Sequence, residues 1–202
     1  MNKKSNFSNL VTALLVACAV LITVLIIRRE FFLPQNPAIT TETEQYIENW
    51  KELEFAGPEG NFPDASIQII KFYDYQCPWC KQAQASVDAI YERYNGEVNF
   101  RYEHFPLTTH DHANEAAIAA ECARNQDAFN SDHAFLFERQ DSLGGFTYIN
   151  LATEAGIGDI SLFSSCIENR ETESIVKSGS SLAQKLNVNT IPSFLINGIL
   201  VP

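Results

Sequence analysis

The sequence of 202 residues has few basic side chains: 14 Lys and Arg stand against 25 Asp and Glu, a formal net charge of −11. Proteins that bind nucleic acid or anionic lipid use surfaces rich in Lys and Arg, so the composition argues against both kinds of partner. The chain has only 9 Gly and 8 Pro and no internal repeat, which excludes collagen-like, low-complexity and solenoid architectures. Its 46% apolar and 19% charged residues are typical of a globular domain with a hydrophobic core.

A single long apolar run lies near the N-terminus. Residues Leu10 to Ile27 are apolar except for two Thr and contain no charged residue, Pro or Gly. A helix of this length, at about 1.5 Å per residue, spans roughly 27 Å, close to the hydrocarbon core of a bilayer. We therefore expect residues 1–30 to form a cytoplasmic tip and an uncleaved transmembrane helix over residues 10–27, which makes the chain a single-pass protein of the cell (inner) membrane.

Two other interpretations of this run stay open. A cleaved signal peptide requires a shorter apolar region and a small-residue cleavage site, and none follows Ile27. A lipoprotein signal would acylate Cys18, because Leu15-Val16-Ala17-Cys18 resembles a lipobox, although nine more apolar or Thr residues follow Cys18. Two basic residues flank the run on each side, so the positive-inside rule does not give its orientation.

The remaining residues divide into a linker and one domain. Residues 31–61 are expected to be a tether with a short helix over Tyr46–Phe55. Residues 62–202 are expected to form an α/β domain, in which one helix follows Cys77 and another carries the apolar stripe Ile175–Leu186. The expected strands are Ser66–Tyr73, Val98–Phe105, Ser193–Ile196 and Ile199–Val201, the last two joined by an Asn197-Gly198 turn.

A helical block, about residues 108–170, is expected between the two halves of the α/β unit. The stretches Ala113–Arg124 and Asp127–Gln140 have helical patterns. Thr147 and Asp159 are typical caps at the start of two further helices, and Gly156 is a typical helix end. The fold class predicted is therefore α/β with a helical insertion.

Cys77 and Cys80 carry the strongest chemical signal. The segment Cys77-Pro78-Trp79-Cys80 follows the first expected strand and opens a helix, where the missing N–H of Pro78 costs little. Unpaired N–H groups at a helix start favour a thiolate, which predicts that Cys77 is the nucleophile and that Cys80 resolves a mixed disulfide. The alternatives are half of a zinc site or a plain structural pair. A zinc site requires a second close pair of ligands, which the cysteines at 18, 122 and 166 do not form, so no metal is expected.

The order of these features resembles the thioredoxin fold of DsbA-like thiol-disulfide oxidoreductases, and within that family the membrane-anchored or exported branch. The resemblance covers nearly all of residues 64–202. It rests on a strand, Cys-Pro-Trp-Cys at a helix start, a helical insertion and Ile191-Pro192 before a strand. Finer matches are Asp64-Ala65, Phe72–Cys80, His104-Phe105-Pro106-Leu107 with His110, Ala116–Ala123 and Asn197-Gly198.

This resemblance implies roles for individual residues. Pro192 corresponds to a cis-proline beside the two sulfur atoms, with the Ile191 backbone pairing with an extended substrate segment; the alternative is an ordinary trans proline at a strand edge. Pro78 and Trp79 are implied to tune the reduction potential. No dissociable cofactor is implied, because the Cys77–Cys80 disulfide is the redox centre. The implied partners are exported proteins with cysteines and a membrane redox protein.

The other cysteines and the histidines have weaker assignments. In some exported relatives, a pair placed like Cys122 and Cys166 forms a structural disulfide; the alternative is two buried free thiols. The four histidines are expected to be structural rather than metal ligands. They are His104, His110, His112 and His133.

The sequence departs from the family pattern at two places. The family usually has an acid six residues before the first cysteine, where it relays a proton to the buried second thiol, and here that residue is Lys71. A buried ammonium would favour the thiolates and make the pair more oxidising. The simpler expectation, which we adopt, is that Lys71 extends outward to solvent while Asp74 or water moves the proton. The family also continues past a motif like Ile199–Pro202 into a closing helix, so a truncated C-terminal end is expected.

The sequence therefore predicts a membrane-tethered, DsbA-like oxidoreductase with its domain on the extracytoplasmic, periplasmic side, where disulfides persist. It would exchange disulfides with exported protein substrates. Two alternatives stay open: a reductase or isomerase of the same fold, and a non-catalytic module that binds extended peptides.

Overall fold

A five-stranded mixed sheet in the order β1-β5-β4-β2-β3 lies at the centre of the protein, whose computed structural model describes residues 44–202. The strands are β1 (Gln45–Tyr46), β2 (Ile67–Tyr73), β3 (Val98–His104), β4 (Ser193–Ile196) and β5 (Ile199–Val201). β2 and β3 are parallel, and the other neighbouring pairs are antiparallel. The strands expected from the sequence are therefore confirmed, each within a residue of its expected bounds.

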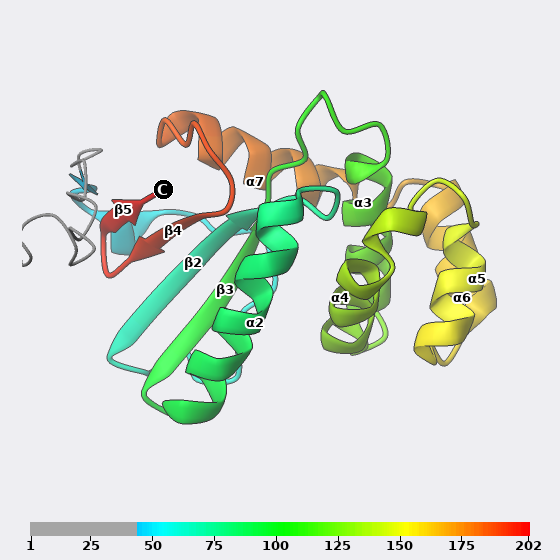
Figure 1. The fold of residues 1–202 in the computed structure, drawn as a ribbon, viewed down its shortest axis with the longest axis horizontal. Coiled ribbons are helices and arrows are strands. Elements are labelled where there is room, and N and C mark those ends of the chain that lie inside the picture. The colour runs from blue at the N-terminus through cyan, green and yellow to red at the C-terminus, as the bar shows by residue number, and fades with distance from the viewer. Residues whose placement is uncertain (1–43) are drawn as a thin grey trace, which may run out of the picture. The chain divides into compact units, whose positions relative to one another are not determined.

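The helices fall into two groups (Figure 1). Those against the sheet are α2 (Pro78–Arg93) and α7 (Glu173–Lys185). Those of the insertion are α3 (Ala113–Arg124), α4 (Phe129–Glu138), α5 (Tyr148–Ala155) and α6 (Ile160–Glu168). Short 3-10 turns are η1 (Trp50–Glu52) and η2 (Gln140–Ser142). The α/β fold with a helical insertion is thus confirmed.

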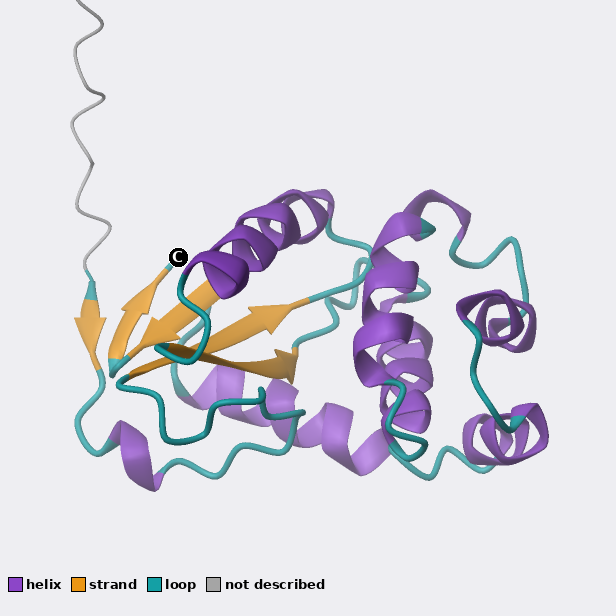
Figure 2. Ribbon diagram, turned by 90° about the horizontal axis from the view of Figure 1, so that it is seen from below, coloured by secondary structure: helices purple, strands orange, loops and turns teal. Residues whose placement is uncertain are grey.

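Side chains that alternate along β2 place α2 and α7 on opposite faces of the sheet (Figure 2). Ile69 packs in a buried cluster with Val87 of α2. Phe72 packs with Leu182 of α7 on the other face. Because successive side chains in a strand point to opposite faces, Lys71 lies on the same face as Ile69, the face covered by the helix that begins after Cys77.

The insertion follows the capping pattern expected from the sequence. The Thr147 hydroxyl accepts a hydrogen bond from the Asn150 N–H at 3.3 Å at the start of α5. Gly156 ends that helix with φ 80°, a left-handed conformation that favours glycine. The Asp159 carboxylate accepts from the Leu162 N–H at 2.9 Å at the start of α6. Local capping chemistry therefore defines these two helices.

Residues 44–61 differ from the expected tether and short helix. In place of a helix over Tyr46–Phe55, the chain forms β1, which pairs with β5, and then the single turn η1. Several apolar side chains of this segment pack against the cluster under α7: Ile47, Trp50, Leu53 and Phe55. The Pro58 carbonyl accepts a hydrogen bond from the Tyr102 N–H at 3.0 Å. The segment joins the domain because it covers apolar surface and pairs the open edges of β5 and β3, and the compact unit begins at Glu44.

The expected transmembrane helix over residues 10–27 and the candidate acylation site Cys18 lie outside the described residues. Among the helices of residues 44–202, none has both the length and the apolar character needed to cross a bilayer.

Asp132, in the first turn of α4, is buried without an ionic partner. Its side chain is 1% exposed, and burial raises its pKa to about 7. A carboxyl pKa raised above its unfolded value stabilises the fold below pH 4, and this contribution is lost as the pH rises through 7. We therefore expect the stability advantage of Asp132→Asn over the wild type, measured as the free energy of unfolding in urea, to be about 2 kcal/mol larger at pH 8 than at pH 5.

The matched control is Glu138→Gln, which removes an exposed carboxylate from the same helix. Its effect should not change between the two pH values. A gain for Asp132→Asn that is equal at pH 5 and pH 8 would contradict the assignment of a buried, titrating carboxyl group.

Candidate active site

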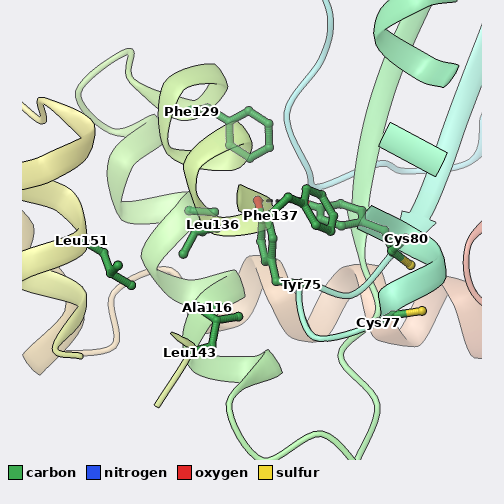
Figure 3. Packing of buried hydrophobic residues seen from close by; sticks show 11 residues of the cluster. Tyr75, Cys77, Cys80, Ala116, Phe129, Leu136, Phe137, Leu143 and Leu151 are labelled. Carbon is green, nitrogen blue, oxygen red and sulfur yellow. Dashed lines mark hydrogen bonds between the residues drawn. The ribbon is translucent and has the colours of Figure 1, made fainter. Parts of the chain in front are cut away.

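The two cysteines lie where β2 leads into α2. Cys77 is the N-cap residue with extended backbone angles, φ −77° and ψ 116°, and Pro78 begins the helix. Both cysteines are free thiols, and Figure 3 shows their sulfur atoms on the same side of the helix start. Cys77 keeps 4% of its surface exposed and Cys80 none, while Trp79 between them is 69% exposed. A partner thiol can therefore approach only Cys77, and Trp79 is positioned to contact that partner.

The loop before Cys77 is held by the Asp74 carboxylate. One oxygen accepts from the Gln76 N–H at 2.7 Å. The other accepts from the Leu107 N–H at 2.8 Å and contacts His110 Nδ1 at 2.7 Å. Since both oxygens bond to the active-site loop and to the segment after β3, Asp74 has a structural role. The expectation that it moves the proton of Cys80 gains no support from this geometry.

Gln140 is a positioning residue that the sequence analysis missed. Its side-chain amide donates to the Tyr75 carbonyl at 2.6 Å and to the Cys77 carbonyl at 3.0 Å. It belongs to η2, 63 residues after Cys77, so no local pattern could have indicated it. Through Gln140 the helical insertion fixes the backbone at Cys77.

Ile191 and Pro192 lie beside the active site. The Ile191–Pro192 peptide bond is cis. The Cys77 thiol lies 3.6 Å from the Ile191 carbonyl oxygen and is placed to donate a hydrogen bond to it. The structure thus brings together Cys77 and Ile191, which are 114 residues apart. Pairing of the Ile191 backbone with a substrate segment stays a prediction.

Lys71 does not extend to solvent, so the expected outward orientation is wrong. Its side chain is 0% exposed. Its amine donates to Gln84 Oε1 at 2.6 Å and lies 5.3 Å from the ring centroid of Tyr73 and 5.0 Å from that of Phe137. The alternation of side chains along β2 explains this, because position 71 lies on the face of the sheet that α2 covers. Side chains of α4 also pack against it there. Burial lowers the pKa of the amine to about 8, against the effect of the Cys80 sulfur, which raises it.

The pKa of the Cys80 thiol is strongly shifted by its surroundings. Burial raises its pKa well above the usual range, and the neighbouring Cys77 acts in the same direction. A hydrogen bond from the Asp74 backbone and the charge of Lys71 oppose this rise. Cys80 is therefore a protonated thiol at neutral pH, and any reaction that makes or uses its thiolate must move a proton through buried surroundings.

Aromatic side chains surround the thiols. Tyr73, Tyr75 and Phe137 belong to the same buried cluster as the two cysteines (Figure 3). The Tyr73 hydroxyl donates to the Tyr75 hydroxyl at 3.2 Å, and the latter contacts His133 Nδ1 at 2.8 Å. Burial lowers the pKa of His133 well below its usual range, so this imidazole is neutral at pH 7.

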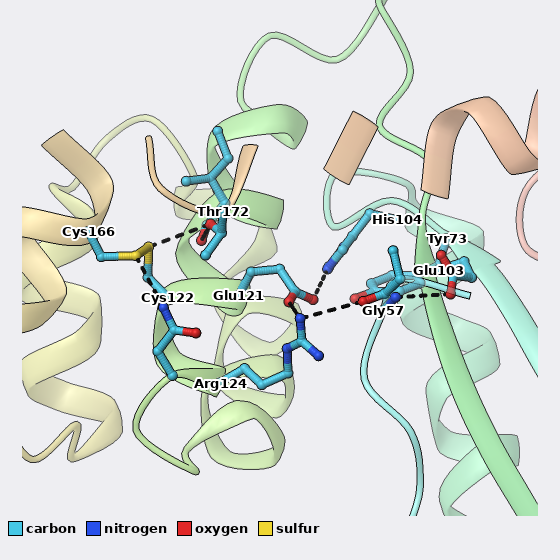
Figure 4. A network of polar contacts seen from close by, with 12 residues as sticks. Gly57, Tyr73, Glu103, His104, Glu121, Cys122, Arg124, Cys166 and Thr172 are labelled. Carbon is cyan, nitrogen blue, oxygen red and sulfur yellow. Dashed lines mark hydrogen bonds and ion pairs between the residues drawn. A yellow bond between two sulfur atoms is a disulfide. The ribbon is translucent and has the colours of Figure 1, made fainter. Parts of the chain in front are cut away.

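A second polar network joins the sheet to the insertion (Figure 4). His104 Nε2 on β3 lies 2.7 Å from the Glu121 carboxylate on α3, which also pairs with Arg124 at 2.6 Å. Glu103 accepts from the Gly57 N–H at 3.0 Å, and burial raises its pKa to about 7. On the far side of α3, Cys122 and Cys166 form a disulfide between α3 and α6. These contacts are structural, because none of them reaches Cys77 or Cys80.

No group of three or more His, Cys, Asp or Glu side chains that could hold a metal ion occurs within residues 44–202. Three of the four histidines in this part of the chain have protein partners for their side chains: His104 bonds to Glu121, His110 to Asp74, and His133 to Tyr75.

A family model described as thioredoxin matches residues 60–201. Curated relatives include an Na(+)/H(+) antiporter, NhaA 1, of Mycobacterium sp. (strain KMS), 28% identical over 139 residues that make up 67% of this chain and 22% of the antiporter. The chain therefore spans about a fifth of the length of the curated relatives it matches.

Solved structures share the fold. A thioredoxin-like oxidoreductase from Silicibacter pomeroyi DSS-3 is 27% identical, with a TM-score of 0.62 over 74% of this chain and 84% of that chain. BdbD from Bacillus subtilis is 24% identical, with a TM-score of 0.64 over 72% and 84%. The thiol-disulfide exchange protein α-DsbA2 from Wolbachia pipientis is 18% identical, with a TM-score of 0.62 over 73% and 80%. The chain thus belongs to the thioredoxin family, and its structural neighbours are thiol-disulfide oxidoreductases of the DsbA type.

Proposed function

We propose that this protein exchanges disulfides with exported, cysteine-containing proteins through a Cys77-Pro78-Trp79-Cys80 redox centre. One observation carries the proposal: two buried free thiols lie at a helix start, only Cys77 keeps any exposed surface, and Cys77 Sγ lies 3.6 Å from the Ile191 carbonyl oxygen. Cys80 follows three residues later in the first turn of the same helix, close enough to Cys77 to close a disulfide with it.

The exchange balances without a dissociable cofactor. A substrate thiolate attacks Cys77 Sγ of the Cys77–Cys80 disulfide, so a substrate–Cys77 bond forms while the Cys77–Cys80 bond breaks and Cys80 leaves as a thiolate. A second substrate thiolate attacks the mixed disulfide at the substrate sulfur and releases Cys77. The substrate is oxidised by two electrons and the Cys77–Cys80 pair is reduced. Reoxidation requires an electron acceptor, which we propose to be a quinone-linked membrane protein.

The domain is proposed to face the extracytoplasmic, periplasmic side of the cell membrane, tethered by a transmembrane helix over residues 10–27. The Cys122–Cys166 disulfide supports this compartment, because structural disulfides are rare where thiols are kept reduced. Since the compact unit begins at Glu44, the tether of this proposal is limited to residues 31–43.

The reduction potential of the Cys77–Cys80 pair tests the direction of electron flow. The full-length protein is equilibrated against glutathione buffers, and the fraction of reduced thiol is read by alkylation and mass spectrometry. We expect a strongly oxidising potential of about −120 mV. The charge of the buried Lys71 opposes the rise in the pKa of the Cys80 thiol and so favours the reduced pair. A value near about −270 mV would instead identify a reductase of the same fold.

A further inference from the structure

Lys71 is an unusual group to find buried in this active site. Its amine is fully covered, yet within residues 44–202 its one hydrogen bond goes to a neutral amide, Gln84 Oε1, at 2.6 Å, and it forms no ion pair. A buried ammonium without a carboxylate partner is costly. A buried ammonium of this kind has either a structural role in packing or a functional role that depends on its charge. The surroundings of Gln84 favour the functional role.

Gln84 connects the buried amine to the surface. Cys80, Gln84 and Asp88 follow each other at four-residue intervals on α2, so they lie along one face of the helix. The Gln84 amide donates from Nε2 to Asp88 Oδ1 at 2.8 Å, while its Oε1 accepts from Lys71. Lys71 is buried, Gln84 half-buried and Asp88 exposed. The three side chains therefore form a continuous polar path from the interior to solvent.

The hydrogen-bond directions around Gln84 are consistent. Because Gln84 Nε2 donates to Asp88, its Oε1 faces both Lys71 and His133 Nε2, the latter at 3.2 Å. His133 is neutral and must carry its proton on Nε2, which leaves Nδ1 to accept from the Tyr75 hydroxyl at 2.8 Å. The imidazole is thus already satisfied on both nitrogens. Lys71 is the group in this network that can exchange a proton with a thiol near pH 7.

A cavity of about 290 Å³ lies at the outer end of this path. Gln84, Asp88 and His133 line it together with Tyr91 and Tyr102. It is large and polar enough at this end to hold water molecules, so a proton that reaches Gln84 and Asp88 can pass to bulk solvent.

We propose that Lys71 is the proton donor and acceptor of the Cys80 thiol, and that Gln84 and Asp88 connect it to solvent in this cavity. This inference rests on the proposed exchange reaction and assigns the proton transfer that the reaction requires. It replaces the expectations that Asp74 moves this proton and that Lys71 faces solvent.

The proton balance is complete in each direction. When a substrate thiolate opens the Cys77–Cys80 disulfide, the Cys80 thiolate takes a proton from the Lys71 ammonium and leaves a neutral amine. Water in the cavity lined by Gln84 and Asp88 then returns a proton to the amine, while the Gln84 amide orients the amine and carries no proton itself. When a mixed disulfide at Cys77 is resolved, the neutral amine takes the proton of the Cys80 thiol, and the resulting thiolate attacks Cys77 Sγ and releases the substrate thiolate.

The lowered pKa of Lys71, about 8, supports this role because both protonation states are accessible near neutral pH. The charged and titratable groups around the amine come from four elements. They are Tyr73 on β2, Cys77, Cys80 and Asp88 at or on α2, Tyr102 on β3, which is paired with Lys71, and His133 on α4; β4 contributes the apolar Phe194.

Two substitutions at position 71 separate proton transfer from charge. Lys71→Met removes both the charge and the exchangeable proton, whereas Lys71→Arg keeps a charge that does not deprotonate. The measurement is the rate of release of a peptide from its mixed disulfide with Cys77, followed from pH 5 to pH 10 on the full-length protein in mild detergent. We expect both variants to lose about 100-fold at pH 7 and to lose the step in the pH profile that belongs to the amine.

Asp88, at the outer end of the path, is exposed, so its substitution does not disturb the hydrophobic core. Asp88→Asn should slow release less than the Lys71 variants do, while Glu92→Gln, an exposed residue of the same helix and cavity, should leave the rate unchanged. Melting temperatures identify any variant at position 71 that does not fold. If the Lys71 variants do not fold, the peptide release rate of Asp88→Asn tests the proposal in their place. A wild-type rate and profile in Lys71→Arg would overturn proton transfer, as would equal rates in Asp88→Asn and Glu92→Gln.

A titration keeps this test distinct from that of the proposed function. In a Cys77→Ser background, the ¹³Cβ shift of Cys80 is followed against pH with Lys71 retained and in the Lys71→Met variant. Coupling to the amine predicts two titration steps with Lys71 retained and one in Lys71→Met. If the wild-type protein exchanges no disulfides, the proposed function fails, and this titration still decides whether Lys71 and Cys80 share a proton.

Discussion

Replacing Cys77 with Ser is expected to reduce disulfide exchange to the uncatalysed background, a loss on the order of 10⁴-fold. Cys77 is the only thiol of the pair with exposed surface, 4% against none for Cys80, so a substrate sulfur has no second site of attack. A serine hydroxyl at the helix start remains protonated and cannot form a disulfide. The measurement is oxidation of a two-cysteine peptide by the oxidised full-length protein, followed by mass spectrometry.

The matched control is Cys80→Ser, which keeps the nucleophile and removes the resolving thiol. This variant should accumulate a mixed disulfide between Cys77 and the substrate. Comparable exchange in Cys77→Ser and the wild type would show that the redox centre lies elsewhere. Full loss of exchange with undiminished binding of the peptide is the expected pattern for catalysis. A wild-type protein that binds the peptide without oxidising or reducing it would favour the non-catalytic peptide-binding module.

Removing the Cys122–Cys166 disulfide is expected to cost about 4 kcal/mol of stability. The two cysteines are 44 residues apart in sequence, and closing a loop of that length restricts the unfolded chain by about this amount in the chain-entropy model. The variant is Cys122→Ala with Cys166→Ala, compared with its parent by urea unfolding. Both carry Cys77→Ser and Cys80→Ser, so that the active-site thiols do not form other disulfides.

The effect should be confined to stability. Because Cys122 and Cys166 lie on the side of α3 away from the sheet and make no contact with the active-site cysteines, the double Ala variant with an intact Cys77–Cys80 pair should exchange disulfides at the wild-type rate wherever it is folded. A loss of less than about 1 kcal/mol would mean that the unfolded chain is not restricted as the model assumes. Slower exchange in the folded variant would reveal coupling between the insertion and the active site.

The polar network around Glu121 is a second connection between the insertion and the sheet. The disulfide ties α3 to α6 within the insertion, whereas His104 and Glu121 tie β3 to α3 at 2.7 Å. Gly179 of α7 packs against the backbone of β3. A Cβ added at this position would lie 2.6 Å from the His104 carbonyl oxygen. The close approach of α7 to β3 is therefore possible only with glycine at position 179.

Several features of this protein follow from the sequence alone. Cys77-Pro78-Trp79-Cys80 predicts a redox pair at a helix start because the helix N-terminus and the spacing of the two thiols are local properties. The strands, the Asn197-Gly198 turn and the caps at Thr147 and Asp159 are likewise set by residues within a few positions of each other. The helical patterns within about residues 108–170 predicted the insertion, and the resemblance to DsbA-like proteins supplied the family.

Only the tertiary structure decided the surroundings of the thiols. Whether Lys71 faces solvent or the interior depends on which helices cover β2, and α4, which provides His133 and Phe137, lies about sixty residues further along the chain. Gln140 and Ile191 reach Cys77 across 63 and 114 residues. The segment 44–61 formed an edge strand instead of a helix because pairing with β5 and covering apolar surface outweighed its weak helical period. Local patterns determined the strands, the helices and the position of the Cys77–Cys80 pair. Contacts between distant segments determined which groups are buried beside the two thiols, because burial and hydrogen-bond partners are properties of the folded chain.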